Sequence, residues 1–411
     1  MNLIESVAHD DPRRLEVRRW IENHPKPTGR ELAVAGYVVP HWPPPYGFDA
    51  DPVEQLIIDE ELKRACIKRP TNPTGIGWVA PTIFAHGTPK QRDRYLWPAL
   101  SGEEIWCQLF SEPDAGSDLA NLATQAVRDG DDYVINGSKI WTSGAHKAKF
   151  GILIARTNPD APKHKGISFF ICPMDLPGIE LKDIVDMTTA HSFNQVYFTD
   201  VRIPADLRLS EENDGWRLTR VTLSNERVSL SGDGVLWDSG PSTRDLLDLL
   251  RHNGGIQVPL LRQRAAQLYI EARILELIRI RRLSSAIADR APGPESSIRK
   301  LFADEHGASV MEFAKDIVGA NGMITGSGPV GALPAHRHSA PTEVTFKPDA
   351  YVNVEPIWHY GFLFSPALTL GGGTWAIQRN VIGERILGLP PEPDYTRFLP
   401  WVETRKVSTL P

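Results

Sequence analysis

Apolar side chains recur at helical spacing through the first hundred residues. Over 53–66 they fall on one helical face, and Asp51 and Pro52 just before that face are typical of an N-cap and a first turn. A second amphipathic helix is predicted over 90–100, and the three prolines at 43–45 predict a rigid loop between helices. We therefore expect an N-terminal α-helical domain over 1–105.

The hydrophobic period falls to two from about residue 106. The dipeptides Asp129-Gly130 and Asn136-Gly137 are strong hairpin signals on either side of a strand-like run, and further apolar runs follow. This block predicts a compact antiparallel β domain over 106–206.

Helical periodicity returns from about residue 207. The run 261–290 contains no glycine or proline, and further helices are predicted over 298–318 and 376–388. The stretch 319–350 is rich in Gly, Pro, Ser and His and predicts a long loop, which is uncommon unless functional. We expect a C-terminal helical bundle over 207–411, so the fold class is α+β.

Composition excludes several classes of function. The chain has 411 residues and a net charge of −6, so it has no basic surplus for nucleic acid. No apolar run reaches the length of a membrane helix, roughly 18 residues, and the charged first thirty residues lack a signal core. Three scattered cysteines fit a reducing cytoplasm and neither a disulfide framework nor a zinc site. We expect a cytoplasmic protein with no membrane partner.

Four segments carry candidate chemistry. In 109–120, Gly116 permits a sharp turn, and Ser111 and Ser117 can donate to a planar ligand or an anion, although such loops are often only connections. In 139–144, Trp141 precedes the hydroxyl residues Thr142 and Ser143. An aromatic wall beside hydroxyls suits a flat heterocycle, and a core tryptophan is the alternative.

The other two segments lie in the helical C-terminal region. Glu226 and Arg227 form either a solvated face or a general base whose pKa an apolar pocket raises. The glycine run 371–373 lets backbone approach a ligand, and Thr374 can cap the next helix. His336 and His338 have no partner at ligand spacing, so we predict no metal site.

These segments together resemble the acyl-CoA dehydrogenase family over nearly the whole chain. The resemblance runs through LIIDEEL, LFSEPDAGSD, DYVINGSKIWTSG, FNQVYFTDVRIP, NERVSL and GGGTWAIQRNVIGERILGLP. It implies an N-terminal α domain, a middle β domain and a C-terminal four-helix bundle, with FAD between the last two. It implies α,β-dehydrogenation of an acyl-CoA thioester, with electron-transferring flavoprotein as the usual acceptor.

The resemblance also assigns roles to individual residues. It implies that one group lines the flavin and the thioester: Phe110, Ser111, Gly116 and Ser117. It implies that Trp141, Thr142 and Ser143 pack on the isoalloxazine ring, that Arg227 lies near the substrate, and that Gly373 and Thr374 meet the flavin region.

The catalytic base is expected at a less common position. Many members carry it as the Glu of a Tyr-Glu-Gly-Thr turn, which here is Gly371-Gly372-Gly373-Thr374. Isovaleryl- and long-chain-type members carry it on an earlier helix before an arginine, which matches Glu226. Gly372 would leave space for a bulky or branched acyl group at the substrate site.

Some positions depart from the family pattern. Trp375-Ala376 replaces a small residue followed by Glu or Gln, and the Arg-x-x-Phe-Gly helix start is not evident around Arg251–Ile256. Asp316 replaces an upstream Gln, His191-Ser192 differs from the usual pair, and the loop 323–357 is longer than usual. A partner subunit could supply missing contacts to FAD.

The sequence segments are most similar to those of bacterial members of the family that act in steroid and bulky-lipid catabolism. Some of these members assemble as α2β2. The main expectation is an acyl-CoA dehydrogenase that forms a homo- or hetero-oligomer, as a dimer or tetramer. Two alternatives are a subunit that is not self-sufficient within a heteromeric complex, and an acyl-CoA oxidase-like flavoenzyme on the same fold.

Overall fold

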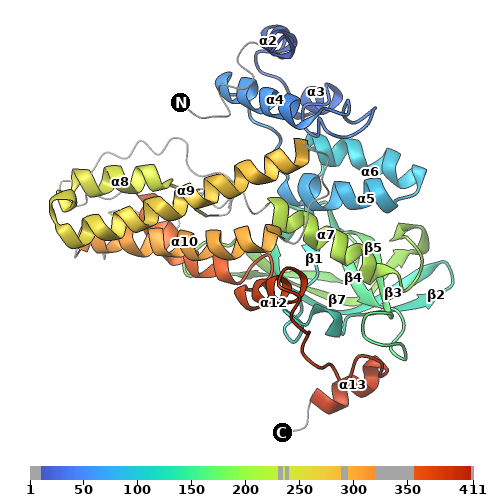
Figure 1. The fold of residues 1–411 in the computed structure, drawn as a ribbon. Helices are drawn as coiled ribbons and strands as arrows, with labels where there is room; N and C mark the ends of the chain where they lie inside the picture. The colour runs from blue at the N-terminus through green and yellow to red at the C-terminus, as the bar shows by residue number, and fades with distance from the viewer. Residues whose placement is uncertain (1–10, 230–234, 237–239, 288–294, 320–355, 409–411) are drawn as a thin grey trace.

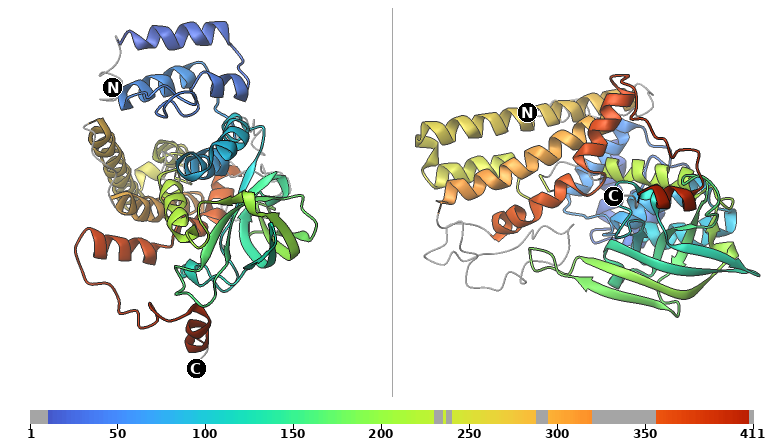
Figure 2. Two further views of the ribbon diagram at one scale, coloured as in Figure 1. Left: turned by 90° about the vertical axis from the view of Figure 1, so that its right-hand side faces the viewer. Right: turned by 90° about the horizontal axis from the view of Figure 1, so that it is seen from below.

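The computed structural model describes residues 11–229, 235–236, 240–287, 295–319 and 356–408. Helices form both ends of the described chain and a β-sheet forms its middle (Figure 1). Helix α2 (Arg13–Asn23) and helix α13 (Trp401–Ser408) lie at opposite ends of the molecule in Figure 1 and in the left view of Figure 2. This helix–sheet–helix order confirms the α+β fold class.

The N-terminal helices begin where the sequence places caps. Asp51 caps α4 by accepting from the backbone N–H groups of Val53 and Glu54, with Pro52 in the first turn. The predicted helix over 90–100 is part of α6, which begins with a Thr88–Gln91 capping box. The other helices of this region are α3 (Gly29–Val34), α4 (Pro52–Arg64), α5 (Ala80–His86), α6 (Pro89–Ser101) and the short π-helix η1 (Thr74–Val79).

An eight-stranded sheet forms the middle of the chain. Its main path has the order β6-β7-β3-β2-β4-β5-β8, and β1 pairs with β4 off this path. The strands are β1 (Trp106–Leu109), β2 (Gln125–Asp129), β3 (Asp132–Ser143), β4 (Phe150–Arg156), β5 (Ile167–Pro173), β6 (Ile179–Ile184), β7 (Phe193–Pro204) and β8 (Arg208–Leu209). Short 3₁₀ turns η2 (Leu119–Asn121), η3 (Ala145–Lys147) and η4 (Ala205–Leu207) connect them.

The two hairpin signals have different outcomes. Asp129 and Gly130 do form the tight connection between β2 and β3, with Gly130 in the left-handed region. The second turn was predicted wrongly: Asn136 and Gly137 lie inside the continuous strand β3, where the register against β7 shifts. The extra residue of this bulge lies on β7, since Ile135 and Gly137 pair with Val201 and Phe198. Gly137 itself packs closely on Thr124, because a Cβ there would come within 2.6 Å of the Thr124 hydroxyl.

The sheet is mostly antiparallel, as expected, but two pairings are parallel. β1 pairs with β4 over four residues, and β2 touches β4 at Gln125 and Arg156. The sequence pattern could not show these pairings, because apolar β1 and β4 are buried and therefore lose the alternation that marks a half-exposed strand.

The C-terminal region is helical. Long helices α9 and α10 pack side by side, as both views of Figure 2 show, and they contain the described parts of the predicted helices 261–290 and 298–318. Its helices are α7 (Gly215–Ser229), α8 (Thr243–His252), α9 (Pro259–Ile287), α10 (Glu295–Val318), α11 (Pro356–Phe364), α12 (Trp375–Arg385) and α13, with 3₁₀ turns η5 (Gly255–Gln257) and η8 (Ser365–Thr369). Most of the predicted loops 319–350 and 323–357, with His336 and His338, lies outside the described residues.

Three buried clusters form the core. One joins the N-terminal helices to one face of the sheet and includes Leu218 of α7. A second fills the opposite face of the sheet around Phe170, and a third fills the helical bundle around Phe313. Within the described chain, no helix is long and apolar enough to cross a membrane.

Candidate flavin and acyl-CoA site

The loop between β1 and β2 is fastened to strand β3. The backbone N–H of Ile140 donates to the carbonyl of Ser111 at 2.9 Å. Lys139 donates to the carbonyl of Phe110 at 3.0 Å and to the carboxylate of Glu112 at 2.8 Å. The loop residues predicted to line a flavin therefore lie directly beside the strand that carries Trp141.

Glu112 and Lys139 form a buried ion pair. The Glu112 carboxylate also accepts from the backbone N–H groups of Ala123 and Thr124. Glu112 stands near the start of the loop and these two residues at its end, so the carboxylate connects the two ends. Burial alone would raise the pKa of Glu112, but the Lys139 ammonium and these N–H donors hold it below its ordinary value. Burial lowers the pKa of Lys139, and Glu112 opposes part of that effect.

A small cavity opens beside Glu112. It has a volume of about 310 Å³, and Glu112, Asn121 and Ser138 are among its walls. The remaining lining residues are Pro113, Asp114, Ala123, Thr124, Gly137 and Tyr197. The cavity thus lies between the loop and the Gly137–Ser138 part of β3.

Trp141 is a platform at the end of β3. It is 57 % exposed and has a positive φ of 60°, and its ring meets Phe193 of β7 edge-on at 5.8 Å. A large aromatic held in a strained conformation and left open to solvent is a common sign of a ligand surface. The residues present therefore fit a flat cofactor such as an isoalloxazine ring.

The hydroxyl residues after Trp141 point in different directions. A register shift between Lys139 and Thr142 breaks the strand's alternation, so that Thr142 points inward and is 1 % exposed while Ser143 is half-buried. The Thr142 hydroxyl has no hydrogen-bond partner among the described residues. Trp141 and Ser143, rather than the Thr142 side chain, are therefore placed to meet a ligand on the open face.

The predicted loop residues divide in the same way. Phe110 is buried against Phe169 and can offer a ligand only its backbone. Gly116 and Ser117 are exposed, and a Cβ added at Gly116 would meet nothing within 4 Å. Gly116 is therefore not required by packing here, which leaves close approach of a ligand as a reason for a glycine.

Helix α7 carries Glu226 and Arg227 in its last turn. The side chains of these two residues lie outside the described part of the structure. The helix itself is firmly docked, because it packs against η1, β5 and α5. Leu218, Thr219 and Thr222 on its inner face are fully buried.

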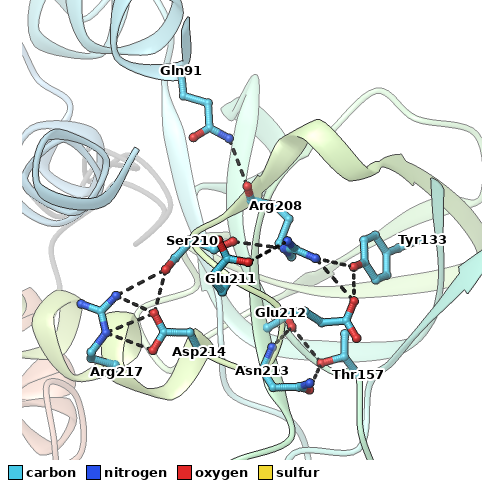
Figure 3. Close-up of polar contacts among 11 residues, drawn as sticks. Gln91, Tyr133, Thr157, Arg208, Ser210, Glu211, Glu212, Asn213, Asp214 and Arg217 are labelled. Carbon is cyan, nitrogen blue, oxygen red and sulfur yellow. Dashed lines mark hydrogen bonds and ion pairs between the residues drawn. The ribbon is translucent and has the colours of Figure 1, made fainter. Parts of the chain in front are cut away.

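A polar junction sets where α7 begins (Figure 3). Asn213, with a positive φ of 69°, donates its N–H to the Ser168 hydroxyl at 2.8 Å and accepts from the Thr157 hydroxyl at 2.7 Å. Asp214 accepts from Arg217 and from the Ser210 hydroxyl. These contacts fix the first turn of α7 to strand β5 and to the end of β4.

Gln378, which the sequence analysis did not single out, stabilises the glycine turn before α12. Gly372 and Gly373 have φ values of 66° and 88°, and the Thr374 hydroxyl accepts from the N–H of Ile377 as an N-cap. Fully buried Gln378 donates to the carbonyls of Gly372 and Gly373, each at 3.2 Å. The turn belongs to the bundle, because α12 packs on α10.

The sequence reasoning also missed Glu112 and Lys139. Period-two alternation could have found Lys139, because Tyr133 and Ile135 mark the inward face of β3 before the bulge. Lys139 keeps this alternation, because the extra residue of the bulge lies on β7. Among the described residues, no group of three or more His, Cys, Asp or Glu side chains is placed to hold a metal ion.

Comparison with known proteins agrees with this architecture. Three family models match in order: the acyl-CoA dehydrogenase N-terminal domain over 8–103, the middle domain over 107–201 and the C-terminal domain over 213–387. Acyl-CoA dehydrogenase IpdE1 of Mycobacterium tuberculosis is 34 % identical over 365 residues, which are 88 % of this chain and 87 % of IpdE1. The chain belongs to the acyl-CoA dehydrogenase family.

Acyl-CoA dehydrogenase FadE34 of M. tuberculosis is 39 % identical over 87 % of this chain. The match covers 45 % of FadE34, so the chain spans less than half of that relative. A solved structure named Tcur3481-Tcur3483 steroid ACAD has a TM-score of 0.72 and 28 % identity, covering 92 % of this chain and 97 % of its own. The ChsE4-ChsE5 complex of M. tuberculosis gives 0.69 and 29 % over the same shares.

Family membership fixes the general chemistry. Acyl-CoA dehydrogenases are FAD-dependent oxidoreductases that act on acyl-CoA, and this chain is one of them.

Proposed function

We propose that this chain oxidises the bond between the α and β carbons of a bulky, steroid-derived acyl-CoA. The observation that carries the proposal is the glycine turn 371–373 before α12, which offers no carboxylate. The docked helix α7 instead carries a carboxylate, that of Glu226, in its last turn. The names of the similar solved structures, which include a steroid ACAD, support the substrate class.

In this proposal Glu226 removes the α-proton as a carboxylate and becomes a carboxylic acid. Bound FAD would supply the acceptor for the hydride of the β carbon, which with the α-proton accounts for the two electrons and two hydrogens that the substrate loses. Trp141 and Ser143 orient the flavin, and Ser117 and Arg227 orient the thioester. Gly372, which has no side chain, leaves room for the acyl group.

The assembly is also proposed. The similar solved structures include a complex of two named chains, ChsE4 and ChsE5. This favours a hetero-oligomer in which a partner subunit completes the FAD site, against a homo-oligomer in which this chain suffices. Electron-transferring flavoprotein is the proposed acceptor, and oxygen is the acceptor in the oxidase-like alternative.

The experiment is anaerobic titration of the purified protein, alone and co-expressed with a homologous partner subunit. Steroid-side-chain and straight-chain acyl-CoA thioesters are added, and the flavin absorbance is followed. We expect bleaching with the steroid thioester. Bleaching only with straight chains would contradict the substrate class, and rapid reoxidation by air would favour the oxidase.

The matched variant is Glu226→Gln, with Ser224→Ala as its control on the exposed side of α7. General-base catalysis is worth about 10²–10⁴-fold. Glu226→Gln should therefore slow bleaching by at least 100-fold with the flavin still bound. A variant that bleaches at the wild-type rate would remove Glu226 as the base.

A further inference from the structure

The chain continues beyond the part that matches the family's C-terminal domain, which ends at residue 387. We call the described residues beyond α12, 389–408, the C-terminal strap. It leaves the bundle and ends in helix α13, away from α12 in Figure 1. Two of its aromatic side chains are almost fully open, Tyr395 at 90 % and Phe398 at 83 %.

A third aromatic, Trp401, is buried. It is 6 % exposed, and its backbone N–H donates to the carbonyl of Ala161 at 2.9 Å. Its indole N–H donates to the side-chain oxygen of Asn121 at 3.0 Å. Pro400 beside it forms a β-bridge with Pro162. The strap is thus anchored on the middle β region around Trp401, where the N–H of Val402 also donates to the carbonyl of Pro159 at 3.3 Å.

Trp401 covers a buried cation. The guanidinium carbon of Arg156 lies 4.6 Å from the centre of the Trp401 ring, and Arg156 is only 2 % exposed. Arg156 donates to the carbonyls of Ala120 and Leu122, and to that of Lys163 at 2.8 Å. A desolvated cation stacked on tryptophan is strongly attracted to the ring, so the ring holds the guanidinium in place.

These contacts hold the C-terminal end of the 110–124 loop, which connects β1 to β2. Ala120, Asn121 and Leu122 immediately precede the two backbone N–H groups that hold Glu112. Asn121 is also a wall of the 310 Å³ cavity. The end of the loop is therefore fixed by Arg156 and Trp401, while Lys139 fixes its beginning.

We propose that Trp401 is a positioning residue: through Arg156 and Asn121, the C-terminal strap holds the 110–124 loop in the conformation that binds FAD. This inference rests on the proposed placement of FAD at that loop. Its alternative is that the strap only stabilises the chain end and has no effect on cofactor binding.

The test compares Trp401→Ala with Phe398→Ala, an aromatic deletion in the same strap at an open position. Trp401→Phe keeps a ring over Arg156 but loses the bond to Asn121. FAD dissociation constants are measured by flavin fluorescence, and amide hydrogen exchange of 119–124 is measured in the cofactor-free protein, with 265–280 of α9 as an internal reference.

We expect Trp401→Ala to weaken FAD binding at least tenfold and to speed exchange of 119–124, with 265–280 unchanged. Trp401→Phe should fall between this variant and the wild type, and Phe398→Ala should stay within twofold of the wild type. If Trp401→Phe and Trp401→Ala both bind FAD like the wild type, the positioning role is wrong.

A different result is expected if FAD does not bind at the 110–124 loop at all. If the wild type with its partner binds FAD but a Ser117→Trp variant binds it equally well, then the loop does not line the flavin. Both proposals then fail, whereas unchanged FAD binding in the Trp401 variants alone rejects only the strap.

Discussion

The hydroxyl oxygens of Thr82 and Thr222 lie 2.9 Å apart, although 140 residues separate them in the sequence. Thr82 belongs to α5 and Thr222 to α7, and both are fully buried. Thr222 precedes Glu226 by one helical turn. The helix that carries the proposed base is therefore tied to the N-terminal helices at the turn before the base.

This contact predicts an effect of Thr222→Val on both stability and rate. The Thr222 hydroxyl also donates to the Leu218 carbonyl of its own helix, so the variant loses that bond as well as the contact with Thr82. Loss of the contact with Thr82 should lower the free energy of unfolding by about 1 kcal/mol beyond the loss of the bond within the helix. Thr219→Val, one turn earlier, removes only a bond to the helix's own Gly215 carbonyl and is the matched control. Urea unfolding and single-turnover flavin reduction measure the two effects. Equal rates in both variants would show that the contact does not position Glu226.

Glu112→Gln should be strongly destabilising. It leaves the Lys139 ammonium buried without its counter-charge, which costs about 3–5 kcal/mol when one partner of a buried pair is removed. Glu180→Gln breaks an exposed pair with Lys182 and should cost under about 0.5 kcal/mol. Chemical unfolding of both variants measures the difference.

The double variant Glu112→Gln/Lys139→Met separates charge from shape. Ala123 and Thr124 donate to different oxygens of Glu112, so the single amide oxygen of the new glutamine keeps one of these two bonds, and no lone cation remains. We expect more than half of the lost stability to return. A double variant as unstable as Glu112→Gln would mean that the pair's hydrogen bonds, and not its charge balance, hold the loop.

Gly373→Ala should disturb the turn before α12. Gly373 has a φ of 88°, and a Cβ there would come within 2.7 Å of the Gln378 amide nitrogen. Gly254 has a similar φ of 70° but open space around it, so Gly254→Ala isolates backbone strain. We expect Gly373→Ala to lose about 1–2 kcal/mol more than the control, by thermal unfolding. Equal losses would mean that Gln378 moves aside freely.

The lowered pKa of His359 predicts how the free energy of unfolding depends on pH. Burial, and then the Lys315 ammonium 2.7 Å away, lower the pKa of His359 to about 4. Between pH 6.5 and 4 the unfolded chain therefore binds a proton that the folded chain does not. Stability should fall as the pH falls through this window, by about 2–3 kcal/mol in full.

His359→Gln keeps an acceptor for Lys315 and removes this titration. Thermal unfolding from pH 7 to pH 4 should show a smaller loss of stability in the variant than in the wild type. The other titrating groups cancel in the comparison. Parallel curves would show that His359 is protonated in the folded protein at acidic pH.

The sequence predicted the parts of the fold that depend on local pattern. Asp51 at the start of α4, and Asp129-Gly130 between β2 and β3, act through neighbouring backbone and were predicted correctly. Asn136-Gly137 was not, because pairing with β7 keeps the strand continuous through a bulge. The parallel β1–β4 pair depends on contacts between residues 44 positions apart, such as Trp106 and Phe150, which no local pattern records. The domain boundaries at 105 and 206 stay predictions.

The residues of the candidate site were assigned by resemblance rather than by physics, and their roles stay predictions. Trp141 and the 110–117 loop do lie side by side. Thr142 points inward because the register of β3 shifts just before it, so Trp141 and Ser143 are left on the open face. Glu112, Lys139, Gln378 and Trp401 were missed, because their importance comes from burial and from partners distant in the chain.

The pairing of β3 with β7 also bears on the order of folding. Asp132 pairs with Pro204, so this strand pair closes a segment of about seventy residues, whereas the β2–β3 hairpin closes locally. Long-range pairing is slow to form. Because Trp141 is held by Phe193 of β7, the aromatic platform is assembled only after that late step. FAD in the refolding buffer should therefore slow unfolding without accelerating refolding.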